Sequence, residues 1–171
     1  MKENLIIERA VKDDAEKIIA FLNKVGGESD NLLFGKDEIL ITIDEEKEFI
    51  DRMNQSSKSI ILLGKIDGNI VSIGTLTGKA RKRIAHRGEV ALSVSKDYWG
   101  QGIGRNMLEE LILFAKVKAS LSVIELTVKA DNENAFQLYK KLGFKQIGYY
   151  EKYFKIDSIY YDAYLMNLYL E

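Results

Sequence analysis

The 171-residue sequence contains no cysteine, no proline and a single histidine, His86. The lack of cysteine excludes disulfides, thiolate nucleophiles and Cys-ligated zinc. One histidine, with no Gly-x-Ser-x-Gly motif, argues against a Ser-His-Asp hydrolase and against a catalytic zinc site. We interpret His86 as a hydrogen-bonding residue at the start of a strand, with a ligand or base role as the alternative.

An excess of charge is also absent, since 25 Lys and Arg face 26 Asp and Glu, for a net charge of −1. This balance does not favour binding to nucleic acid or to an anionic membrane. No apolar run approaches the roughly 20 residues of a membrane span. The start, Met1–Asn4, lacks the pattern of a secretory signal, so we expect a cytoplasmic protein. Length and composition predict one globular domain over residues 1–171.

Apolar periodicity and turn signals predict an α/β protein whose mixed, mostly antiparallel sheet is flanked by helices. Asp13 or Asp14 would cap the first helix, Thr42 and Glu45 have the spacing of a capping box, and Asp67-Gly68 predicts a hairpin turn. Residues 28–40 are expected to be irregular. We expect strands over residues 5–9, 59–66, 69–77, 88–94, 122–128, 144–152 and 161–169, and helices over about 14–25, 42–55, 102–118 and 132–142.

Residues 90–108 are the most informative segment. A buried strand ends at Val94, a short turn follows, and Gly100, Gly102 and Gly104 then open an amphipathic helix. Such glycines let the backbone approach a ligand, and a helix N-terminus offers free N–H groups and a dipole that favours anions. The pattern predicts a phosphate or pyrophosphate site, with a tight turn that binds nothing as the alternative.

Two common phosphate loops do not fit this segment. A dinucleotide-binding G-x-G-x-x-G motif would need a glycine where Arg105 stands. A P-loop needs Lys and Ser or Thr after its last glycine, but Gly104 is followed by Arg105 and Asn106.

A second motif lies downstream, in Asn132, Ala135, Tyr139, Gly143 and Phe144. Together the two segments resemble the GNAT superfamily of N-acetyltransferases. The first is similar to the superfamily's acetyl-CoA pyrophosphate loop, Arg/Gln-x-x-Gly-x-Gly/Ala, and the second to its N-x-x-A-x-x-x-Y-x-x-x-G-F pattern. The resemblance covers residues 89–144 at the level of motifs. Trp99 stands in the Arg/Gln position, so no phosphate contact is carried over to that side chain.

The resemblance implies the GNAT fold, acetyl-CoA as co-substrate without a metal, and acetyl transfer to a primary amine. Backbone N–H groups of residues 92–94, Val94 foremost, would bind pantetheine and the thioester carbonyl, while their side chains pack in a central strand. The residues expected to bind the cofactor are Leu92, Ser93, Val94, Gly100, Gln101, Gly102, Ile103, Gly104, Arg105, Asn132 and Tyr139.

Two side chains are the expected catalytic residues. Tyr139 would act as the general acid that protonates the departing thiolate, because a phenol with a pKa of about 10 stays protonated at neutral pH. Packing in the core beside Phe136 is its alternative role. Glu89 would be the general base, directly or through water. An exposed strand-end glutamate, with the proton released to solvent, is the alternative.

Clues to the partners are fewer. The acidic residues of the irregular segment border the acceptor site in this fold, so a cationic amine is expected, although solvated loop acids are equally consistent. Arg105 is the best candidate phosphate contact, and Lys140 and Lys141 are weaker ones. A basic cluster could bind an acidic partner or the adenosine 3′-phosphate, or could simply be solvated: Lys79, Arg81, Lys82, Arg83 and Arg87.

Residues 161–168 resemble the closing strand of bacterial small-molecule and amino-acid acetyltransferases, which favours a small-molecule amine as substrate. We expect direct attack in a ternary complex, because no cysteine could carry an acetyl intermediate. A homodimer is implied by the resemblance, and no nucleic-acid or membrane partner is expected. A protein or peptide N-acetyltransferase and a non-catalytic acyl-CoA-binding module remain alternatives. Seven of the nine tyrosines could fill the C-terminal hairpin, line the acceptor pocket or form a dimer contact: Tyr149, Tyr150, Tyr153, Tyr160, Tyr161, Tyr164 and Tyr169.

Overall fold

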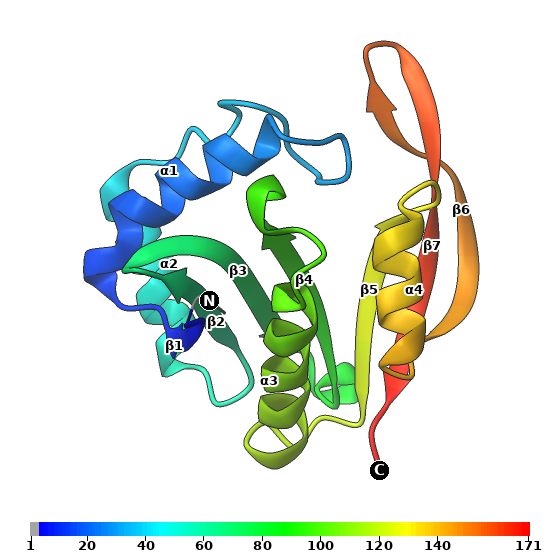
Figure 1. Ribbon diagram of the computed structural model, residues 1–171. Coiled ribbons are helices and arrows are strands. Elements are labelled where there is room, and N and C mark those ends of the chain that lie inside the picture. Colours follow the sequence, from blue (N-terminus) through cyan, green and yellow to red (C-terminus); the bar gives the residue numbers. More distant parts are fainter. Residues whose placement is uncertain (1–3) are drawn as a thin grey trace.

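The computed structural model describes residues 4–171; residues 1–3, which carry most of the stretch judged to lack a secretory signal, lie outside it. Seven strands form one sheet in the order β1-β2-β3-β4-β5-β7-β6 (Figure 1). The strands are β1 Ile6–Arg9, β2 Ile60–Ile66, β3 Asn69–Gly78, β4 Arg87–Val94, β5 Val123–Lys129, β6 Lys145–Ile156 and β7 Ile159–Tyr169. The α-helices are α1 Ala15–Gly26, α2 Ile43–Gln55, α3 Ile103–Val117 and α4 Glu133–Lys141.

Every neighbouring pair of strands is antiparallel except β4 and β5, which run parallel. Helices cover both faces of the sheet. The alternation along β2 shows this, because Ile61 and Leu63 belong to the core cluster of α1 and α2, whereas Ile60 and Leu62 belong to the cluster of α3 on the opposite face. The mixed α/β fold class with a mostly antiparallel sheet is therefore confirmed.

The predicted capping box and the predicted hairpin turn are both present in the structure. The Thr42 hydroxyl accepts a hydrogen bond from the Glu45 backbone N–H at 3.1 Å, and the Glu45 carboxylate accepts one from the Thr42 N–H at 2.7 Å. This reciprocal capping box begins α2. Asp67 and Gly68 both have positive φ, 49° and 77°, as a two-residue hairpin turn requires.

The prediction that Asp13 or Asp14 caps the first helix with its side chain is wrong. A short 3₁₀ turn, Lys12–Asp14, precedes α1, and Asp14 stands at the N-cap position without a side-chain hydrogen bond into the helix. Its carboxylate instead accepts a hydrogen bond from the Val11 N–H at 2.9 Å and pairs with the Lys65 ammonium at 2.9 Å. Asp14 therefore ties the start of α1 to β2 rather than capping it.

The C-terminal hairpin is longer than expected, since β6 continues past residue 152 to Ile156 and β7 already begins at Ile159. Asp157 and Ser158 form its turn with φ of 47° and 69°. The sequence signal was weak because neither turn residue is glycine. In addition, the register shifts between Tyr150 and Phe154, which interrupts the alternation that predicts a strand. The hairpin tip extends beyond the rest of the sheet (Figure 1).

Candidate functional site

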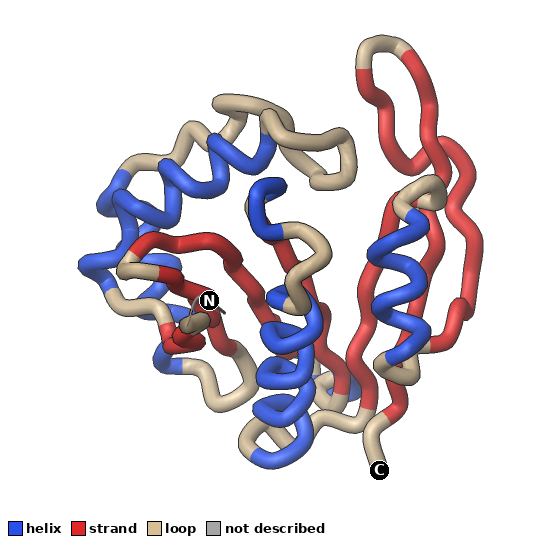
Figure 2. Tube along the Cα trace, in the orientation of Figure 1, coloured by secondary structure: helices blue, strands red, loops and turns tan. Residues whose placement is uncertain are grey.

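The parallel strands β4 and β5 are joined at one end only. Their ladder consists of Arg87 with Val123, Gly88 with Ile124 and Glu89 with Glu125. Beyond these pairs β4 remains bonded to β3 as far as Val94, and β5 remains bonded to β7, but the two strands diverge from each other (Figure 2). Among residues 4–171, the β5-facing edge of β4 after Glu89 has no strand partner.

The unpaired edge of β4 carries backbone N–H groups that point into the gap. Ser95 N–H donates to the Val71 carbonyl of β3 at 2.9 Å. Because alternate residues of a strand direct their N–H groups to the same side, Ser93 also faces β3, whereas Leu92 and Val94 face the gap. Two parallel donors with no strand partner suit a carbonyl oxygen that becomes an oxyanion.

The glycine loop lies next to this edge and begins α3. Gly100 and Gly102 have φ of 75° and 83°, and a Cβ at either would meet no atom within 4 Å. Gly102 is the N-cap of α3 and offers no side chain to the free N–H groups of the first turn. The first turn of α3 lines the cavity, and no cap side chain occupies its N–H groups, as an anion site requires. A Cβ on Gly104 would lie 3.4 Å from Leu138 of α4, so the third glycine allows close approach of the two helices.

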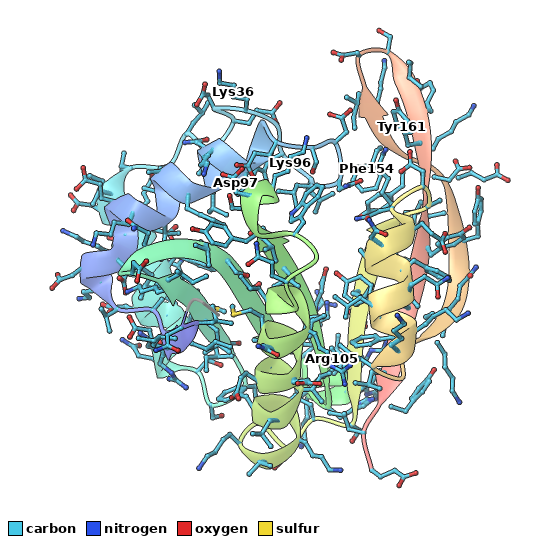
Figure 3. The ribbon with its side chains drawn as sticks, in the orientation of Figure 1. Lys36, Lys96, Asp97, Arg105, Phe154 and Tyr161 are labelled. Carbon is cyan, nitrogen blue, oxygen red and sulfur yellow. The ribbon has the colours of Figure 1, made fainter. Side chains whose placement is uncertain are left out.

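Three side chains in and next to the glycine loop have hydrogen-bond or ion-pair partners within the protein. The Trp99 indole N–H donates to the Val94 carbonyl at 2.8 Å, and the Gln101 amide donates to the Asp97 carbonyl at 3.2 Å. Arg105 lies between α3 and α4 (Figure 3) and pairs with Glu109 at 2.8 Å across one helical turn. An exposed pair of this kind contributes little to stability, so the guanidinium can exchange it for a phosphate.

Tyr139 and Asn132 come from the second motif. The Asn132 side chain accepts a hydrogen bond from the Ala135 N–H at 3.3 Å and thereby caps α4. About two turns after the cap, the Tyr139 ring packs against Phe144 with the ring centroids 5.7 Å apart. Burial raises the pKa of Tyr139 to about 12, so its hydroxyl is protonated at neutral pH. It can donate a proton but cannot act as a base.

Glu89 belongs to a network of charges at the paired end of β4. The Lys79 ammonium lies 2.9 Å from the Glu89 carboxylate and 2.7 Å from that of Glu125, which Arg87 also contacts at 2.6 Å. Burial alone would raise the pKa of Glu125, but hydrogen bonds from Lys79 and Arg87 lower it overall. Lys79 and Arg87, two members of the basic cluster, are thus held in ion pairs with these glutamates. Glu89 itself is exposed at the point where the strands diverge.

A cavity of about 910 Å³ connects these elements. Every residue predicted for catalysis or cofactor binding lines it except Gln101. The structure therefore brings together residues from β4, the glycine loop and α4 that lie up to fifty positions apart in sequence. Their individual roles stay predictions.

The same cavity extends between the sheet and the first two helices, where it includes residues that sequence reasoning missed. Among them are Phe49 and Glu46 of α2, Thr75 of β3 and Phe154 of β6. In Figure 3 the Phe154 side chain points from the β6–β7 hairpin toward the cavity. Glu46 is only 4% exposed, and burial raises the pKa of its carboxyl to about 7. Its spacing from Ile50 and Met53 places it on the apolar face of α2, which is the signal that could have found it.

The acids of the irregular segment are partly used to hold the loops. The Glu28 carboxylate accepts hydrogen bonds from the Lys96 backbone N–H at 2.7 Å and from the Ser95 hydroxyl at 3.3 Å. This fixes the end of α1 against the turn that leads into the glycine loop. Glu38 accepts a hydrogen bond from the Gly35 N–H at 2.8 Å. Asp30 and Asp37 are exposed, as solvated loop acids would be.

His86 is exposed, and its carbonyl accepts hydrogen bonds from the Ser122 and Val123 N–H groups. Within residues 4–171, no group of three or more His, Asp or Glu side chains is arranged to hold a metal ion. None of the helices described there combines the length and apolarity needed to cross a membrane.

Comparison with known proteins bears on this arrangement. The family model for the acetyltransferase (GNAT) family matches residues 33–144. The chain belongs to this family. The family and its fold are as the sequence motifs predicted, and with them acetyl-CoA as the donor that the family uses. The match includes the diverging strands, the glycine loop and α4.

Relatives within the GNAT family differ in their acceptors. A GNAT acetyltransferase from Streptococcus pneumoniae is 35% identical, with a TM-score of 0.95 over 98% of this chain and 100% of that one. The L-amino acid N-acetyltransferase AaaT of Escherichia coli is 32% identical over 105 residues, 61% of this chain and 65% of that protein. The N-alpha-acetyltransferase RimI of Mycobacterium tuberculosis is 37% identical over 76 residues, 44% of each chain. The matched segment thus spans less than two thirds of either curated relative.

Proposed function

We propose that this chain is an acetyl-CoA-dependent N-acetyltransferase that acetylates the primary amine of a small molecule in a ternary complex. One observation carries the proposal. The N–H groups of Leu92 and Val94 point into the gap between β4 and β5, inside the cavity that also contains the glycine loop and Tyr139. The proposal assigns an anion site, two oxyanion donors and a proton donor to residues that line one cavity.

The reaction follows from these groups. The neutral amine nitrogen attacks the thioester carbonyl carbon, forming the C–N bond, and the N–H groups of Leu92 and Val94 stabilise the oxyanion. Collapse of the intermediate breaks the C–S bond, and the Tyr139 hydroxyl gives its proton to the departing thiolate. The proton lost by nitrogen goes to Glu89, directly or through water, or to solvent. Tyr139 then regains a proton from solvent.

The shape of the acceptor side supports a small amine. On that side the cavity lies between the sheet and helices α1 and α2, and it is lined by apolar side chains such as Leu22 and Phe49. An arm of the cavity that lies beneath two helices suits a compact acceptor better than an extended peptide. AaaT, an amino-acid acetyltransferase by name, supports the same class. The N-alpha-acetyltransferase RimI favours the second candidate, in which the acceptor is the α-amino group of a peptide or protein.

The test is calorimetric titration with acetyl-CoA followed by a thiol-release screen over small amines and short peptides with a free α-amino group. We expect binding, and release with at least one small amine. Release with peptides alone would replace the small-molecule proposal by the second candidate. Binding without release would favour a non-catalytic acyl-CoA-binding module, and the absence of binding would refute the proposed site.

We also propose that the protein works in the cytoplasm as a homodimer. The outer hairpin of β6 and β7 exposes apolar and aromatic side chains, which suits contact with a second copy: Ile147, Tyr149, Tyr150, Ile159 and Tyr160. Light scattering after size-exclusion chromatography tests the dimer, and a monomeric mass across the micromolar range would refute it.

A further inference from the structure

One buried carboxylate in the cavity has no part in the reaction described above. Glu46 of α2 is 4% exposed and lines the cavity on the acceptor side. Its side chain forms no hydrogen bond or ion pair with any group in residues 4–171. Carboxylates are almost never buried without a partner, because loss of hydration destabilises the charged form strongly. A buried acid that opens onto a cavity therefore points to a partner supplied by a ligand.

The surroundings of Glu46 are apolar. The arm of the cavity that it lines is formed by Ile18 and Leu22 of α1, Phe49 of α2 and Ile61 of β2. Burial is the one cause of the rise in the pKa of Glu46 to about 7, and no neighbouring charge offsets it. The carboxyl therefore has a pKa of about 7 in a largely apolar part of the cavity.

Charged side chains on the elements packed against α2 are engaged elsewhere or face solvent. On the 3₁₀ turn before α1, Lys12 pairs with Asp51, Asp14 pairs with Lys65, and Asp13 is exposed. On α1, Lys24 pairs with Glu28, and Glu16 and Lys17 are exposed. The one charged residue of β2, Lys65, is held by Glu8 and Asp14.

The floor of the arm runs from beneath α2 to the reacting centre. Ile61, Thr75 and Ala91 lie side by side on β2, β3 and β4, and all three line the cavity. α2 packs on β2, whereas the free N–H groups of Leu92 and Val94 lie at the far edge of β4. Since neighbouring strands are about 4.8 Å apart, two strand spacings separate the ends of this row by roughly 10 Å.

We propose that Glu46 anchors a second cationic group of the acceptor. The acceptor would be an aliphatic chain with the reacting amine at one end and an ammonium or guanidinium at the other. The inference rests on the proposed function, because it takes the gap between β4 and β5 as the site of acetyl transfer.

The chemistry of the arm fits such an acceptor. An apolar lining favours methylene groups, and a chain comparable to the stem of a lysine side chain spans most of the distance. A cation that reaches Glu46 completes a buried ion pair, and its attraction offsets the loss of hydration of the carboxylate. Binding near neutral pH would then release a proton from Glu46. An acceptor with an anionic end would be rejected by the same carboxylate.

The experiment compares two acceptors of equal length, pentylamine and 1,5-diaminopentane, in a thiol-release assay with acetyl-CoA. Wild-type protein is expected to show a kcat/KM for the diamine at least about tenfold above that for the monoamine, equivalent to one favourable contact. Glu46→Gln, which keeps the shape and removes the charge, should bring the ratio down to about two, the statistical factor for a diamine with two equivalent amines. Glu48→Gln, an exposed position on the same helix, should leave the ratio unchanged.

Equal use of both acceptors by wild type, or a ratio unaffected by Glu46→Gln, would overturn the inference. So would an equal loss of kcat on both acceptors in the variant, which would place Glu46 in proton transfer. If acetyl-CoA binds but neither amine releases thiol, the anchor is tested without turnover, by calorimetry with the diamine. Tighter diamine binding by wild type than by Glu46→Gln supports the anchor, and equal binding refutes it.

Discussion

Replacing Glu46 by Gln is expected to stabilise the protein at neutral pH and to change how its stability depends on pH. The carboxyl is 4% exposed, and its pKa rises from 4.5 to about 7 on folding because burial disfavours the charged form. A group whose pKa is raised by folding contributes stability below its unfolded pKa, and this contribution is lost as the pH rises through the folded pKa.

The magnitude follows from this shift. Between pH 4.5 and about 7 the folded protein keeps a proton that the unfolded chain has lost. The free energy of unfolding therefore falls by about 1.4 kcal/mol for each pH unit in that window. The total loss is about 3 kcal/mol at most, since water that enters the cavity reduces it. Glutamine cannot ionise, so the variant does not undergo this loss.

The assay is urea unfolding of the wild type and the variant at intervals from pH 4.5 to 8.5. The difference in free energy of unfolding should grow in favour of Glu46→Gln up to about pH 7 and stay constant above it. Glu48→Gln controls for the removal of a charge from the same helix. Parallel curves for wild type and Glu46→Gln would refute the reasoning, because they would mean that folding does not perturb this carboxyl.

Three further substitutions test the site and the fold. Gly102→Asp should weaken acetyl-CoA binding at least about tenfold relative to Gly102→Asn, because both residues tolerate positive φ but only Asp repels a pyrophosphate; equal affinities in calorimetry would argue against an anion site. Tyr139→Phe should lower kcat about a hundredfold with the affinity for acetyl-CoA little changed, and wild-type turnover would reduce Tyr139 to packing. Thr42→Ala should lower the free energy of unfolding by about 1 kcal/mol through loss of the capping box, and unchanged urea stability would contradict it.

Features that depend on a few neighbouring residues could be predicted from the sequence. The capping box of α2 and the Asp67-Gly68 turn are examples, because the contacts involved lie within three residues. The glycine loop and the second motif were also recognisable. They located the family and the part of the cavity wall formed by β4, the glycine loop and α4, since the fold brings these elements together in a fixed way.

Features set by distant contacts could not be predicted in this way. Asp14 looked like a helix cap, but Lys65, fifty-one positions away, holds its carboxylate instead. The ends of β6 and β7 were missed because a register shift hides the alternation. The spacing of Glu46 places it on the apolar face of α2, but the cavity that it lines forms only when α1 and β2 pack against that helix.

Trp99 is the single tryptophan of the sequence, and its indole closes the end of β4 by donating to the Val94 carbonyl at 2.8 Å. The ring is 45% exposed and lines the cavity beside the glycine loop. All tryptophan fluorescence of this chain therefore originates at the loop proposed to receive the pyrophosphate. The position in which the family pattern has a phosphate-binding side chain thus holds an intrinsic optical reporter, through which arrival of the donor can be followed in unlabelled protein.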